Sequence, residues 1–216
     1  MNVQTVMLVV HPHRATALAM ARRCANGLED RGIKVVALDE SPPDLGLTRA
    51  GAETPVDLIV VFGGDGSILR GSEIAREQDV PLIGVNLGHV GFLAELDEEE
   101  AGDIVEQIAS GRFTIQERMT LDVSVVRQNR VVATSWALNE ASIEKSARER
   151  MIQLVAEVDR RPLSTWGCDG VLFATPTGST GYAWSAGGPV VWPTDDAMLL
   201  VPVSAHALFA RPMVVS

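Results

Sequence analysis

The first half of the chain alternates between two kinds of segment, and this alternation limits the folds that it can adopt. Four short apolar runs rich in valine and isoleucine occupy residues 5–10, 33–38, 56–62 and 80–86. Continuous apolar runs of this length, separated by turn residues or by helical spacing, are typical of a parallel sheet covered on both faces. One helix between the first two runs is predicted to end before Gly32, and its apolar face comprises Leu18, Ala21, Ala25 and Leu28.

Two more helices are predicted in this half. One follows Gly66, and the other begins at Asp97, where Glu100 completes a capping box, and ends at Gly111. The acidic residues near Asp97 suit a helix N-terminus, which we favour over a cation site. Residues 41–55 contain proline and glycine and are predicted to form a loop.

After Gly111 the pattern changes to the strict alternation of half-buried strands. Residues 121–125 place every second apolar residue on one face, residues 127–130 form a turn, and residues 152–158 repeat the alternation. We therefore predict an α/β plus β fold, with an α/β domain over residues 1–112 and a β-rich domain over residues 113–216.

Composition narrows the possible partners and compartment. A net charge of −10 argues against nucleic-acid binding, which depends on lysine and arginine at phosphates. The first apolar run is broken by His11 and Pro12, so it does not read as a secretory signal, and no run is long enough to span a membrane. Cys24 and Cys168 lack metal-ligand spacing and read as reduced core thiols. These features predict a cytoplasmic protein.

The sequence Gly63-Gly64-Asp65-Gly66 lies where an apolar run meets a predicted helix. Glycines at this position leave backbone N–H groups accessible near a helix N-terminus, an arrangement that attracts phosphate. It is neither a Walker A loop nor a dinucleotide fingerprint. Asp65 would repel bound phosphate unless it accepts a proton from an attacking hydroxyl or helps to place Mg²⁺; the alternative is a plain turn with Asp65 as a local cap.

Two segments of the second half also suggest a polar ligand. Residues 168–189 gather glycine, threonine and serine around a predicted strand, and include Tyr182, the single tyrosine of the chain. Tyr182 is either a buried structural residue or an aromatic face for a nucleobase. Asn139 and Glu140 stand together near a strand end, where such a pair also occurs in ordinary turns.

Five segments together resemble the NAD kinases in order and spacing: GGDG at 63–66, NLGHVGFL at 86–93, LNE at 138–140, CDGVLFATPTGSTGYAWSAGGP at 168–189 and PVSAHALFARP at 202–212. GGDG is shared with diacylglycerol kinases, sphingosine kinases and phosphofructokinases, whereas the TPTGST segment is more specific. The resemblance covers nearly the whole chain. It implies a Rossmann-like α/β domain followed by a β-sandwich-like domain, with the active site in the crevice between them.

The resemblance also implies a reaction and a set of site residues. The family transfers the terminal phosphate of ATP, or in some members of polyphosphate, to the 2′-hydroxyl of the NAD adenosine ribose, which gives NADP. By this likeness Asp65 is the general base, and Gly63, Gly64 and Gly66 let the backbone approach phosphates. The residues that would bind NAD are Asn139, Glu140, Asp169, Thr177, Thr180, Tyr182 and Ser185.

No compact group of carboxylates in the sequence suggests a metal-binding site formed by the protein, and no residue is predicted to be a metal ligand. The expected cofactor is therefore a divalent ion such as Mg²⁺ that arrives with the nucleotide. The expected partners are NAD, ATP or polyphosphate, and further copies of the chain in a dimer or tetramer.

Three departures from the family pattern qualify this expectation. Gly181 stands where the family usually has alanine, and Ala205 stands where a proline commonly precedes the histidine, here His206. The family continues beyond the position of Ser216, so we expect an incomplete β domain with weak activity and a tendency to aggregate. The alternatives are a lipid kinase that shares GGDG and a non-catalytic NAD(P)-binding module.

Overall fold

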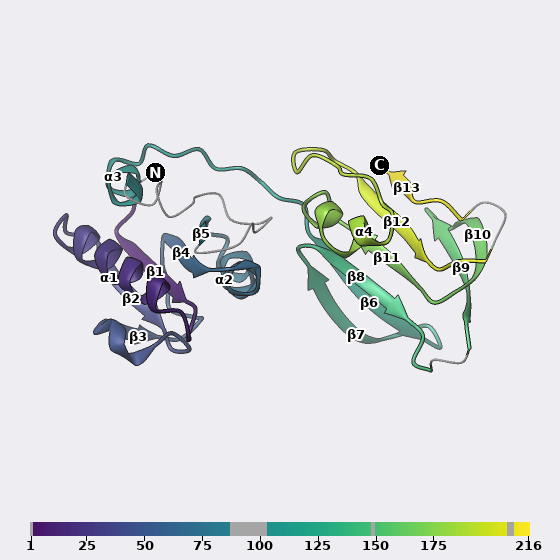
Figure 1. Ribbon diagram of the computed structural model, residues 1–216, viewed down its shortest axis with the longest axis horizontal. Helices are drawn as coiled ribbons and strands as arrows, with labels where there is room; N and C mark the ends of the chain where they lie inside the picture. The colour runs from purple at the N-terminus through teal and green to yellow at the C-terminus, as the bar shows by residue number, and fades with distance from the viewer. Residues whose placement is uncertain (1, 87–102, 148–149, 207–209) are drawn as a thin grey trace. The chain divides into compact units, whose positions relative to one another are not determined.

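The computed structural model describes residues 2–86, 103–147, 150–206 and 210–216 (Figure 1). The chain divides into two compact units, Met1–Ile115 and Gln116–Ser216, and each is described by itself. The predicted helix start at Asp97, with its capping box to Glu100, and most of the NLGHVGFL segment lie outside the described residues.

A five-stranded parallel sheet forms the centre of the first unit (Figure 1). Its strands occur in the order β3-β2-β1-β4-β5, with bounds β1 Thr5–Val10, β2 Lys34–Leu38, β3 Thr48–Ala50, β4 Leu58–Gly63 and β5 Leu82–Asn86. The four predicted runs are confirmed as neighbouring parallel strands. The loop predicted over residues 41–55 is partly wrong, because it also contains β3 and the short 3-10 helix Pro43–Leu45. Among the described strands, β3 pairs only with β2, and its three residues are too few to show a periodic pattern.

Helices cover both faces of this sheet. They are α1 Ala15–Glu29, α2 Asp65–Gln78 and α3 Ile104–Ser110. Alternate residues of β1 enter different cores: Val6 and Leu8 pack in the cluster that holds residues of α1 and α3, whereas Met7 packs in the cluster that holds residues of α2. Residues that alternate between two helical layers account for the continuous apolar runs of the sequence.

Two helices end close before a glycine, as predicted, and the start of a third differs from the prediction. α1 ends before Gly32, and α3 ends at Gly111, whose φ of 65° is left-handed. The second helix begins at Asp65 rather than after Gly66. Gly64 is its N-cap, and a glycine in the first turn is tolerated because the N–H groups there have no intrahelical partner.

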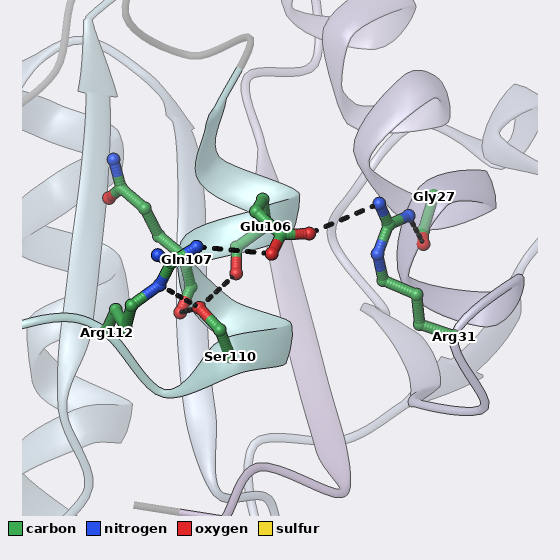
Figure 2. A network of polar contacts seen from close by, with 6 residues as sticks. All are labelled: Gly27, Arg31, Glu106, Gln107, Ser110 and Arg112. Carbon is green, nitrogen blue, oxygen red and sulfur yellow. Dashed lines mark hydrogen bonds and ion pairs between the residues drawn. The ribbon is translucent and has the colours of Figure 1, made fainter.

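A polar network links the end of α1 to α3 (Figure 2). Glu106 lies 3.5 Å from Arg31 and 3.3 Å from Arg112. Arg31 also donates to the carbonyl of Gly27 at 2.9 Å, and Arg112 donates to Ser110 at 3.0 Å. These side chains are largely solvated, so the network contributes little to stability.

The second unit is built from antiparallel strands (Figure 1). Two hairpins, β6 with β7 and β9 with β10, accompany a four-stranded sheet of order β13-β12-β11-β8. The bounds are β6 Leu121–Arg127, β7 Arg130–Ala137, β8 Glu140–Glu144, β9 Ile152–Val158, β10 Arg161–Cys168, β11 Gly170–Ala174, β12 Met198–Val203 and β13 Met213–Val215. The predicted change to β structure is confirmed, and so is the turn at residues 127–130, where Gln128 and Asn129 have positive φ.

The four-stranded sheet packs on both faces. Val171 of β11 joins a core with Trp166 of the β9–β10 hairpin, and Leu172 joins a core with Ala183. Ala183 belongs to the short helix α4, Tyr182–Ser185, which follows a 3-10 turn, Thr177–Thr180. The TPTGST segment is therefore held at one end of β11 by its own buried neighbours.

Cys24 and Cys168 are buried free thiols, as predicted. Burial raises the pKa of the Cys24 thiol to about 12, because a thiolate is poorly solvated in an apolar core. Among the described residues, no helix has the length and apolar character required to cross a membrane.

Candidate active site

A cavity of about 310 Å³ lies at the carboxyl ends of β1, β2 and β4. β1 is paired with β2 on one side and with β4 on the other. The strands that follow β1 are therefore added on one side of it up to β3 and on the other side from β4 onward. Such a switch in strand order opens a crevice where ligands of α/β sheets bind. The cavity is lined by Val9, Val10, His11, Leu38, Glu40, Ser41, Gly64, Gly66, Ser67 and Arg70.

Gly64 and Gly66 of the glycine turn line this cavity, whereas Gly63 and Asp65 are next to them in the chain but are not among its lining residues. A β-carbon at Gly63 would lie 2.6 Å from the β-carbon of Ser67, which no rotation of the serine side chain can relieve, so the position requires glycine. Gly64 and Gly66 face open space instead, which leaves their backbone accessible to a ligand. Asp65 is half-buried and occupies the first turn of α2, where the helix dipole favours a carboxylate.

An ion-pair cluster contributes Glu40 and Arg70 to the cavity lining. The Arg70 guanidinium donates to both carboxylate oxygens of Glu40, at 2.5 and 3.0 Å, and to Glu73 at 2.5 Å. The hydrogen bond from Arg70 lowers the pKa of Glu40. Ser41 is fixed by β1, because its hydroxyl accepts the Val10 N–H at 3.2 Å and reaches the Leu8 carbonyl at 3.4 Å.

In the second unit, hydrogen bonds fold the TPTGST segment onto Asn139. The N–H of Thr175 donates to the Asn139 carbonyl at 2.9 Å, and its hydroxyl donates to the Leu138 carbonyl at 2.5 Å. The same hydroxyl accepts the N–H of Gly178 at 3.0 Å. Gly178 is required here, since a β-carbon would lie 2.0 Å from the Asn139 carbonyl oxygen.

Three polar atoms gather around this fold without hydrogen-bond partners among the described residues. They are Oδ1 of Asn139, Oε2 of Glu140 and Oγ1 of Thr177, and each atom is buried. Burial also raises the pKa of Glu140. A buried polar atom without a partner costs about 1–3 kcal/mol, so the cluster is suited to a ligand that supplies the missing bonds.

The other predicted NAD-binding residues differ in their placement. Thr180 is half-buried, Tyr182 is 40% exposed and Ser185 is exposed, so the reading of Tyr182 as a buried structural residue is wrong. Asp169 precedes β11 at the end opposite Thr175, about 20 Å away at 3.3 Å per residue, and it pairs with Lys145 at 2.6 Å.

His206 is exposed, and its backbone N–H donates to the carbonyl of Gly167 at 2.9 Å. It lies in an isolated bridge outside the named strands.

Sequence reasoning missed several residues that the structure brings into the site. His11, Glu40 and Ser41 line the cavity, and Gly178 supports the TPTGST fold. His11 and Glu40 each follow closely after a predicted strand. That position is a usable signal, because carboxyl ends of parallel strands meet at one edge of a sheet.

The described residues contain no group of three or more histidine, cysteine, aspartate or glutamate side chains placed to hold a metal ion. The cavity walls offer backbone N–H, hydroxyl and imidazole groups, together with the Arg70 guanidinium and its Glu40 partner. The N–H donors among these groups suit phosphate oxygens.

Comparisons with known proteins place both units in one family. Residues 6–113 match the model of the ATP-NAD kinase N-terminal domain, and residues 138–216 match that of the ATP-NAD kinase C-terminal domain. The chain belongs to the NAD kinase family. The predicted family, enzyme class and α/β plus β fold are thereby confirmed.

Similar proteins support the same assignment. The chain is 47% identical to NAD kinase 2 of Streptomyces coelicolor and 46% identical to NAD kinase of Thermobifida fusca, and it covers 74% and 70% of their lengths. These matches include 100% and 99% of this chain.

Among solved structures, an Archaeoglobus fulgidus NAD kinase in complex with ATP is 28% identical, with a TM-score of 0.72 over 98% of this chain and 76% of that one. Yeast NADH kinase complexed with NADH, at 24% identity, shares the fold, with a TM-score of 0.89 over 100% of this chain and 70% of that one.

Proposed function

We propose that this chain transfers the terminal phosphate of ATP, or of polyphosphate, to the 2′-hydroxyl of the adenosine ribose of NAD. The observation that carries this proposal is the position of Asp65. This carboxylate stands in the first turn of α2 between two glycines whose backbone borders the cavity. A base beside an accessible phosphate-binding backbone is what phosphoryl transfer to a hydroxyl requires.

In the proposed reaction, Asp65 accepts the proton of the 2′-hydroxyl while the ribose oxygen bonds to the terminal phosphorus. The bond from that phosphorus to the bridging oxygen breaks, and ADP or the shortened polyphosphate leaves. General-base help of this kind contributes about 10² to 10⁴ in rate. A Mg²⁺ ion that arrives with the nucleotide would offset charge on the donor phosphates.

We assign NAD recognition to the second unit. Oδ1 of Asn139 and Oε2 of Glu140 are buried acceptors without partners among the described residues, and the hydroxyls and amino group of adenosine are suitable donors. Thr177, Thr180 and Ser185 would add hydroxyl contacts, and the exposed ring of Tyr182 would stack on a base.

We further propose that the protein acts in the cytoplasm as a homo-oligomer. This rests on the family likeness and on the sequence features given above.

The test of the proposed function is formation of NADP from NAD, ATP and Mg²⁺ by the full chain and by two variants. Asp65→Asn removes the base and is expected to lower turnover at least 10²-fold while NAD binding is retained. Glu77→Gln makes the same chemical change at an exposed position of α2 and is expected to behave as the parent protein. Near-normal turnover of Asp65→Asn would contradict the assigned role.

A further inference from the structure

His11 is fixed beside the glycine turn by the sheet itself. Its backbone N–H donates to the carbonyl of Phe62 at 2.9 Å, which ties the end of β1 to the end of β4. The β-carbon of His11 is 3.4 Å from the position that a β-carbon on Gly63 would take. His11 lines the same cavity as Gly64 and Gly66.

The hydrogen bonds of the His11 ring define which nitrogen carries a proton. Nδ1 accepts the backbone N–H of His13 at 3.2 Å, so in the neutral imidazole the proton is on Nε2. No hydrogen bond from Nε2 to any of the described residues is present. His11 thus offers one uncommitted N–H donor at the cavity.

Two of the other polar side chains that line the cavity, Ser41 and Arg70, are already engaged. The Ser41 hydroxyl is used by β1 at both its donor and acceptor positions, and the Arg70 guanidinium is held by Glu40 and Glu73. A phosphate group on the backbone of Gly64 and Gly66 would meet His11 without the loss of an existing hydrogen bond.

We propose that Nε2 of His11 donates a hydrogen bond to a phosphate oxygen of the phosphoryl donor. This inference rests on the proposed function and adds a donor-binding residue to it. The ligand chemistry is a chain of phosphates, which ATP and polyphosphate share. The proposed contact is with the phosphate chain of the donor, so loss of His11 should weaken donor binding and leave the affinity for NAD unchanged.

Two isosteric substitutions separate this role from a structural one. Asparagine at position 11 places an acceptor near the position of Nδ1 and lacks the distal donor, whereas glutamine places an amide N–H near the position of Nε2. We expect His11→Asn to raise the KM for ATP about tenfold or more, the loss of one hydrogen bond to a charged group, with the KM for NAD unchanged. His11→Gln should retain most of the ATP affinity.

The matched control is His13→Asn. His13 is exposed, its ring centroid is 6.2 Å from that of His11, and the N–H that it gives to His11 belongs to its backbone. This variant should keep the parent KM for both substrates. Inhibition by tripolyphosphate, measured in competition with ATP, should weaken in His11→Asn as much as ATP binding does.

The opposite order, with ATP affinity lost in His11→Gln and kept in His11→Asn, would overturn the proposal, because it would assign the effect to the bond with His13. An unchanged response to tripolyphosphate would also overturn it, since the ring would then contact the nucleoside. If the parent protein forms no NADP, the proposed function fails, and calorimetric titration of the same variants with ATP still tests His11.

Discussion

Gly178→Ala tests whether the TPTGST fold depends on close backbone contact with Asn139. The added β-carbon would lie 2.0 Å from the carbonyl oxygen of Asn139 and 2.4 Å from its carbonyl carbon. Both are backbone atoms, and the N–H of Thr175 holds that carbonyl at 2.9 Å. Relief to an ordinary contact of 3.4 Å needs a displacement of about 1.4 Å, which no side-chain rotation can provide.

The magnitude follows from the contacts that this displacement breaks. Loss of the hydrogen bond from the Gly178 N–H to Thr175 costs about 1 kcal/mol, and overpacking costs about 1–3 kcal/mol. We therefore expect the free energy of unfolding to fall by about 2–4 kcal/mol. Thr177 is adjacent and would move with the turn, so affinity for NAD should fall about tenfold, the loss of one hydrogen bond.

The measurements are denaturant unfolding and calorimetric titration with NAD. Gly181→Ala is the matched control, because its β-carbon would lie 3.3 Å from Glu140 Oε2 and from the carbonyl oxygen of Gly178, contacts that small adjustments relieve. Its unfolding free energy should change by less than about 1 kcal/mol. A Gly178→Ala protein with parent stability and NAD affinity would refute the steric reasoning.

Two further predictions concern buried titratable groups. Burial raises the pKa of Glu140, so its charged form destabilises the fold; this cost is absent below the unfolded pKa of about 4.3 and is fully present above the folded pKa. Glu140→Gln should accordingly gain thermal stability relative to the parent as pH rises from 4 to 8, and a difference independent of pH would contradict this. Because burial raises the pKa of Cys24 to about 12 and also raises that of Cys168, neither thiol should react with a disulfide reagent at pH 8 within minutes, whereas both should react in denaturant. Rapid labelling of the native protein would show that these thiols are accessible.

The sequence predicted the strands whose signals are local and continuous. β1 and β4 are buried on both faces, so each is an apolar run that needs no knowledge of its neighbours. β3 is a strand because it pairs with β2. Its three residues are too few to show a periodic pattern in the sequence, so it was not predicted. The helix start at Asp65 was misplaced because glycine suggests a break, whereas Gly66 lies in the first turn of α2.

The candidate site was predicted only where a motif stands within one segment. Gly63 to Gly66 and the TPTGST segment are each continuous, and family likeness gave their residues roles that remain predictions. The position of His11 after a strand marks it as a candidate but does not show that it meets Arg70, which is 59 positions away along the chain. They line one cavity because β1 lies between β2 and β4.

By itself, the sequence determined the fold class, the family and the segments that matter, since apolar period and motif composition are properties of consecutive residues. The tertiary structure decided which atoms meet. The register that places Ala174 opposite Glu140 brings the backbone of Asn139 into close contact with Gly178. Three buried oxygens near this contact have no hydrogen-bond partners among the described residues. Strand order and register arise from packing between distant segments, and no local pattern encodes them.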